Sequence, residues 1–181
     1  MPRVNQTARK ILLWLLLAAI AQAQPTPAGE YQVKAAFVFN FAKFVDWPAT
    51  AWKSNADPFR VCVLGEDPFG GALQAALEGK TLKDHPGAVA HLSDVKDAGG
   101  CRIVFVSKSQ KKNLHAVLAA LHGPGILTVG ESEGFAAEGG AIGFRLDDVN
   151  VHLEINLQTV QQQGLQVSSK LLSLAQIVKK P

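Results

Sequence analysis

The feature that most constrains the fold of this chain is an alternation of short apolar runs with helix-like segments, which extends from residue 59 to residue 129. The apolar runs are rich in β-branched residues and predict strands at Phe59 to Leu64, Ala88 to Leu92, Cys101 to Val106 and Ile126 to Val129. The segments between them predict helices at Gly71 to Glu78 and Ser109 to Leu121, and a helical turn from Ser93. Strands that alternate with helices indicate an α/β fold in three layers, a mostly parallel sheet with helices on both faces.

The pattern changes near Ala141, where apolar and polar residues alternate on either side of Asp147 and Asp148. Such alternation is typical of an antiparallel hairpin with one solvated face. A two-residue loop at these aspartates would pair Leu146 with Val149, and would keep the apolar side chains on one face. The same register would pair Phe144 with Val151 and would give the polar face Arg145, Asn150, His152 and Glu154.

The chain is expected to close with two helices. A short one precedes Gly164, and a last one runs from Ser169 to about Val178, with Ser168 or Ser169 as its N-cap. The apolar side of this last helix would consist of Leu171, Leu172, Leu174 and Ile177.

The first 23 residues have the pattern of a secretory signal peptide. Basic residues lead into the apolar run ILLWLLLAAI, and the small-residue motif AQA predicts cleavage near Ala23 and export of the remaining chain. A retained membrane anchor would need roughly 20 apolar residues, more than this run provides. The expected organisation is therefore a cleaved signal peptide over residues 1–23 and a single domain over residues 24–181.

Removing the signal peptide also changes the charge balance. It holds three of the 18 Lys and Arg residues and none of the 15 Asp and Glu residues, so 15 charges of each sign remain. A neutral chain gives no support to nucleic acid as a partner.

A helix from about Tyr31 to Asp46, ended by Pro48, opens the expected domain. Its segment AAFVFNFAKFVDWP is too polar for a membrane span. One face carries a wide apolar stripe suited to the core, formed by Val33, Phe37, Phe41 and Phe44 with Val38 and Val45 beside them. The opposite face carries Phe39 with Lys43 and Asp46. An aromatic residue on a polar face is either covered by the same chain or offered to a partner, so these three residues are candidates for partner binding or self-association.

The chain has two cysteines, Cys62 and Cys101, both on predicted strands. Export permits a disulfide, and neighbouring strands can bring the two Cα atoms within bridging distance. The alternative is a pair of buried free thiols.

The sequence contains no nucleophile elbow, zinc-protease motif or phosphate loop. Two glycine-rich loops follow predicted strands, GEDPFG with Glu66, Asp67 and Phe69, and GESEGFAAEGG with Glu131 and Phe135. If both strands are parallel, both loops emerge at one edge of the sheet, and Glu66, Phe69, Glu131 and Phe135 could line one crevice for a small ligand or partner. The glycines indicate tight turns or, less favoured, a close approach by another group.

The five histidines are scattered and predict no metal site, and no cofactor is expected. A hydrolase that uses His152 and Glu154 is a weak alternative, because no nucleophile stands at a known spacing from them.

An ordered series of segments resembles the YfiR-like family of bacterial periplasmic proteins. The segments span about Glu30 to Val178: EYQVKAAFVFNFAKFVDWP, VCVLGEDPFGGAL, CRIVFVS, ILTVGESEGFAAEGGAIGF and VHLEINLQTVQQQGLQVSSKLLSLAQIV.

The resemblance implies a regulator and not an enzyme. Such proteins bind the sensor region of an inner-membrane diguanylate cyclase and repress it, which lowers cyclic-di-GMP and biofilm formation. An OmpA-like outer-membrane lipoprotein can sequester them, and members form homodimers. The resemblance also implies a disulfide between Cys62 and Cys101. A second cysteine pair found in some members is missing, since Ala136 and Gly143 stand in that region and no further cysteine is present. A periplasmic small-ligand-binding sensor remains the alternative function.

Overall fold

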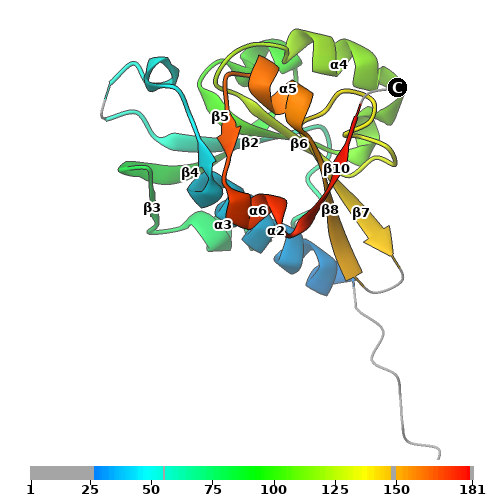
Figure 1. Ribbon diagram of the computed structural model, residues 1–181. Coiled ribbons are helices and arrows are strands. Elements are labelled where there is room, and N and C mark those ends of the chain that lie inside the picture. The colour runs from blue at the N-terminus through cyan, green and yellow to red at the C-terminus, as the bar shows by residue number, and fades with distance from the viewer. Residues whose placement is uncertain (1–26, 55, 148–149, 180–181) are drawn as a thin grey trace, which may run out of the picture.

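The structure is a computed structural model that describes residues 27–54, 56–147 and 150–179 (Figure 1). The signal peptide and its cleavage site lie outside the described residues. The helices are α2 (Pro27–Phe44), α3 (Ala72–Leu77), α4 (Leu114–Ala120), α5 (Leu157–Gln162) and α6 (Ser169–Leu172), with 3-10 turns η1 (Ala49–Ala51), η2 (Val95–Ala98) and η3 (Lys108–Asn113). The strands are β1 (Val45–Asp46), β2 (Phe59–Leu64), β3 (Thr81–Leu82), β4 (His85–Leu92), β5 (Cys101–Val106), β6 (Leu127–Gly130), β7 (Ile142–Asp147), β8 (Asn150–Asn156), β9 (Gln166–Val167) and β10 (Ala175–Val178).

Eight strands form one sheet in the order β10-β8-β7-β6-β5-β2-β4-β3. The five central strands β4, β2, β5, β6 and β7 are mutually parallel. Strand β8 is antiparallel to β7, and β10 runs parallel to β8. This arrangement confirms a mostly parallel sheet with an antiparallel carboxy-terminal hairpin. A separate pair, β1 with β9, ties the end of α2 to the segment before α6.

Helices cover both faces of the sheet, so the expected three layers are present (Figure 1). Because successive side chains of a strand point to opposite faces, β5 supplies Ile103 and Phe105 to a core under α2 and α3, and Val104 and Val106 to a second core under α4. Strands β2, β5 and β6 are buried on both faces, which explains their nearly continuous apolar sequences.

The buried stripe of α2 contains Val38, Phe41 and Val45, as predicted, but differs from the prediction in its other members. The buried residues are Lys34, Ala35, Val38, Phe41, Ala42 and, just after the helix, Val45. Phe37 is only half-buried, and Val33 is 46% exposed, so its assignment to the core was wrong. The helix contacts α3 at its side as well as the sheet, and this rotates its buried face toward α3.

The hairpin forms, but in a different register. Phe144 pairs with Leu153 and Leu146 with Val151, so the predicted register was wrong by two residues. A shift of two residues leaves every side chain on its predicted face, because the side-chain period of a strand is two. Arg145 and Glu154 accordingly share the polar face, where their side chains lie 3.5 Å apart.

The predicted last helix was wrong beyond its first turn. Ser168 does cap α6 through the N–H of Leu171, but the helix ends at Leu172, and residues 175–178 form β10. The pairing of β10 with β8 sets Ile177 beside Ile155. Hydrogen bonding to the open edge of β8 outweighs the helical spacing of the apolar residues, a tertiary effect that local sequence does not record.

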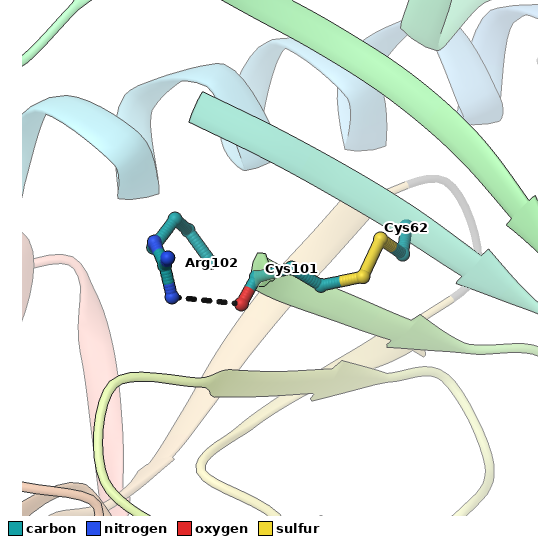
Figure 2. Close-up of a disulfide and its surroundings, with 3 residues drawn as sticks. All are labelled: Cys62, Cys101 and Arg102. Carbon is teal, nitrogen blue, oxygen red and sulfur yellow. Dashed lines mark hydrogen bonds between the residues drawn. A yellow bond between two sulfur atoms is a disulfide. The ribbon is translucent and has the colours of Figure 1, made fainter. Parts of the chain in front are cut away.

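Cys62 and Cys101 form a disulfide between β2 and β5, as predicted. The two strands are neighbours in the sheet, and the Cα atoms lie 5.9 Å apart. Figure 2 shows the bridge crossing between the two strands, with Arg102 directly after Cys101. The bridge therefore joins two central strands, at the first residue of β5 and the fourth residue of β2.

Candidate functional site at the carboxyl ends of the parallel strands

A buried cluster of charged side chains lies where β6 ends. Glu131 follows β6 directly, and the first turns of α2 bring three polar side chains to it. The ammonium group of Lys34 contacts the carboxylates of both Glu131 and Glu30. The Tyr31 hydroxyl donates to Glu131, with distances of 3.1 and 3.3 Å to its two carboxylate oxygens. Glu30 and Lys34 are four residues apart, a spacing that places them on one side of the helix.

Water has almost no access to the centre of this cluster. The side chains of Lys34 and Glu131 are each 2% exposed. The Lys34 nitrogen also lies 4.6 Å from the centre of the Tyr31 ring and 5.9 Å from that of Phe144. Two carboxylates therefore share one ammonium group in a poorly solvated site, and each charge depends on its partners for stabilisation.

Tyr31 is held as a neutral hydrogen-bond donor. Burial raises the pKa of its phenol far above the ordinary value, and the negative charge and hydrogen bond of Glu131 and the charge of Glu30 raise that pKa further. The phenol therefore stays protonated even at a pH where an ordinary tyrosine ionises, with its hydroxyl directed at Glu131.

A groove of about 750 Å³ lies between the starts of α2 and α3. Small and apolar residues dominate its lining, which consists of Tyr31, Gln32, Pro68, Phe69, Gly70, Gly71, Ala72, Ala75 and Ala76. The Phe69 ring packs edge-on against Tyr31 and Phe105, at centroid distances of 5.7 and 4.8 Å. The surface suits an apolar or aromatic group better than a charged one.

A second groove, of about 560 Å³, lies on the other side of Glu131. Its lining is strongly charged and consists of Lys108, Glu131, Glu133, Gly134, Phe144, Arg145, Leu146 and Glu154. Glu131 lines this groove and bonds to Tyr31, which lines the first, so the buried cluster separates the two.

The two predicted loops do not line a single crevice. Glu66 is exposed, and its N–H donates to the Ser109 hydroxyl at 3.0 Å. Asp67 accepts from the N–H of Phe69 at 2.8 Å and lies 2.8 Å from the ring of His91. Phe69 is buried in the core under α2. Of the predicted crevice, Phe69 lines the first groove and Glu131 the second.

Phe135 is directed into the other core, under α4. Its ring fits between Gly130 and Gly140, where a Cβ atom would lie only 2.3 and 2.1 Å from ring atoms. At Gly130 and Gly140 the glycine therefore permits a close approach by another group, and tight turns do not explain these two positions. The approaching group is the Phe135 ring of the same chain. Gly134 and Gly139 do occupy turns with positive φ. Phe135 thus packs into the core beneath this loop and lines neither groove.

The predicted partner-binding patch is partly covered. Phe39 is half-buried and packs against the core, while Lys43 lies exposed with its nitrogen 5.3 Å from the centre of the Phe39 ring. Asp46 lies beyond α2, on β1, and pairs with Lys83 at 2.7 Å. Their role in partner binding stays a prediction.

Lys34, Tyr31 and Glu30 were missed in the sequence. A signal was present, since Lys34 stands three and seven residues before Phe37 and Phe41, on the helix face that packs inward. A lysine on such a face needs a buried anion. Nothing local indicates that the anion is Glu131, 97 residues away along the chain.

Over the described ranges, no group of three or more His, Cys, Asp or Glu side chains is arranged to hold a metal ion. In the same part of the chain, no helix combines the length and apolar character that a bilayer crossing needs.

The model of a family described as YfiR/HmsC-like matches residues 31–176. The chain belongs to the YfiR/HmsC-like family. This is a family of periplasmic regulators without known catalysis. No curated protein matches the chain.

Among solved structures, an ABC domain in complex with L-Trp from Streptococcus pneumonia is similar to this chain with a TM-score of 0.49 and 10% sequence identity. The similarity covers 80% of this chain and 60% of that one, so the chain spans about 60% of the length of that protein.

Proposed function

We propose that this YfiR/HmsC-like protein is a non-enzymatic periplasmic regulator that represses an inner-membrane diguanylate cyclase. It binds the periplasmic sensor region of the cyclase, and so lowers cyclic-di-GMP and biofilm formation. Membership of the family over residues 31–176 carries this proposal. An OmpA-like outer-membrane lipoprotein is the proposed antagonist, and the protein acts as a homodimer.

Regulation by stoichiometric binding requires exposed contact surfaces. One candidate surface is the predicted patch of Phe39, Lys43 and Asp46. A second is the hairpin end of the sheet, where Leu146 is 49% exposed, Leu174 68% and Ile177 44%. Leu146 lies on β7, Leu174 directly precedes β10, and Ile177 lies on β10, the last strand at this end of the sheet. Apolar side chains beside an open strand edge favour association with another protein.

The test compares cells that have the cognate cyclase with and without this protein. Loss of the protein should raise cyclic-di-GMP, and the wild-type gene should restore the low level. The variant Leu174→Asp should restore it less well if the β10 surface contacts the cyclase or a second copy. Lys96→Gln, a change to a side chain that is 86% exposed, is the matched control. Unchanged cyclic-di-GMP on loss of the protein contradicts the cyclase proposal.

A second candidate function, a small-ligand-binding sensor, is favoured by the groove of about 750 Å³ between α2 and α3. A thermal-shift screen tests it, since a ligand at about 100 times its dissociation constant adds roughly 2.7 kcal/mol of stability. The variant Ala75→Trp should fill the groove and abolish any such shift. A hit that survives this substitution does not bind in the groove.

A further inference from the structure

A third hollow lies at the opposite end of the sheet, next to the disulfide. Its volume is about 190 Å³, and its lining includes three cations, Lys53, Arg60 and Arg102, one carboxylate, Asp57, and the backbone of Gly99 and Gly100. Arg60 is the second residue of β2 and Arg102 the second of β5, so the hollow lies at the amino-terminal ends of the central strands.

Arg102 is buried without an ionic partner. The residue is 8% exposed, and its Nε atom has no hydrogen-bond partner among the described residues. One terminal nitrogen donates a long hydrogen bond of 3.4 Å to the carbonyl of Cys101 (Figure 2). A guanidinium group has five N–H donors, and burial of unsatisfied charged donors is unfavourable. The site is therefore incomplete without a further acceptor.

The one carboxylate of the hollow is already engaged. Asp57 accepts hydrogen bonds from the N–H groups of Lys53 and Ser54, at 2.9 and 3.1 Å, and from the Ser54 hydroxyl at 3.1 Å. In the described part of the chain, no carboxylate lies within 4.0 Å of the cationic nitrogens of Lys53, Arg60 or Arg102. Burial lowers the pKa of Arg102; Asp57 opposes this effect and Arg60 adds to it. The hollow thus holds an excess of two positive charges.

The guanidinium groups are held in place by rigid neighbours. The register between β2 and β5 shifts after Arg60, so Arg102 stands in a bulge, a feature that redirects side chains. Its guanidinium carbon lies 4.8 Å from the centre of the Trp52 ring, which stacks on His85 at 3.7 Å. The disulfide joins the strands that carry the two arginines. Because these side chains are already held in place, an anion that binds here would lose little free energy to ordering them.

We propose that this hollow binds a phosphate group, either as the free ion or as the end of a phosphomonoester. Paired guanidinium groups match the oxygen atoms of phosphate through parallel N–H···O bonds, and Lys53 adds a point charge. A volume of about 190 Å³ has room for roughly six waters, which suits an ion of five heavy atoms with part of its hydration shell. The site is separate from the surfaces of the proposed regulator function and does not depend on that function.

Calorimetric titration at constant ionic strength tests the proposal with two probes, inorganic phosphate and glycerol phosphate. Protein purified from the periplasm with its disulfide intact should bind at least one of them with a stoichiometry of one. Arg60→Gln should weaken that binding at least tenfold, because it removes one of the two guanidinium groups of the hollow. Arg60 is only half-buried, so this substitution leaves the fold intact. Lys53→Gln should weaken it severalfold.

Lys96→Gln is the control and should bind like the wild type. The relative affinity of the two probes distinguishes a free ion from a phosphomonoester as the natural ligand. Thermal unfolding of each variant without ligand establishes that it is folded. Absence of binding by the wild type to both probes overturns the proposal, and so does an equal affinity of Arg60→Gln and Lys96→Gln for the probe that binds.

Discussion

Lys34→Met tests the buried cluster most directly. The substitution keeps the aliphatic length of the side chain but removes the ammonium group that contacts Glu131 and Glu30. Removal of one partner of a buried ion pair costs about 3–5 kcal/mol, because the remaining charge loses its compensation. The Glu131 side chain is only 2% exposed, so the cost of leaving its carboxylate unpaired should fall near the upper end of this range. The Glu30 side chain is 18% exposed, so its carboxylate regains some hydration.

A total unfolding free energy of about 5–15 kcal/mol is usual for a domain, so the loss would remove a third or more of it in many cases. Urea denaturation followed by tryptophan fluorescence measures the change. Lys43→Met, at an exposed lysine of the same helix, is the control and should cost less than about 1 kcal/mol.

A double variant separates the charge effect from lost packing. Glu131→Gln keeps an acceptor for the Tyr31 hydroxyl but carries no charge, so Lys34→Met with Glu131→Gln should be more stable than Lys34→Met alone. The coupling between the two positions should fall at about 1–3 kcal/mol. If Lys34→Met costs no more than Lys43→Met, or if the double variant shows no recovery, the cluster does not stabilise the fold as argued.

Three further results are expected. Tyr31 is the only tyrosine, so tyrosinate absorbance reports on this residue alone. Because the fold raises the pKa of its phenol, Tyr31 should stay protonated in the folded protein through about pH 10, where the tyrosine of the urea-unfolded chain ionises. Stability from Tyr31 is thus full below about pH 10 and is lost above it, a loss that Tyr31→Phe should remove; a folded midpoint near pH 10 would contradict the assignment. Mass spectrometry should find no alkylatable thiol before reduction, and the double change Cys62→Ala with Cys101→Ala should cost about 2–5 kcal/mol. Phe39→Asp should weaken self-association in sedimentation analysis while the protein stays folded; unfolding would instead identify Phe39 as a core residue.

The central strands could be predicted from local sequence. Phe59–Leu64 and Cys101–Val106 have the predicted bounds, because each is apolar apart from one arginine. Pro58 directly precedes the first strand and Gly100 the second. The disulfide followed from the same runs, since both cysteines lie on strands that are neighbours in the sheet. Here local pattern and tertiary structure agree, which is expected for a sheet interior.

The edge of the sheet could not be predicted in the same way. Residues 175–178 have no strong strand pattern of their own, and only the open edge of β8 makes them a strand. The hairpin register likewise depends on the turn, and a slip of two residues changes no apolar face. The candidate site had the same difficulty, because its two parts, Lys34 and Glu131, meet only after folding.

The two charged sites lie at opposite ends of the parallel strands, and this separation has an energetic consequence. Glu131 follows the carboxyl end of β6, whereas Arg60 and Arg102 begin β2 and β5. Six-residue strands are about 20 Å long, beyond the 7–10 Å over which substitutions usually couple. The stabilisation that phosphate confers through Arg60 and Arg102 should therefore be the same in Lys34→Met as in the wild type. The carboxyl end, with its buried charge cluster between two grooves, and the amino end, with its arginine pair tied by the disulfide, then act as independent sites on one rigid sheet.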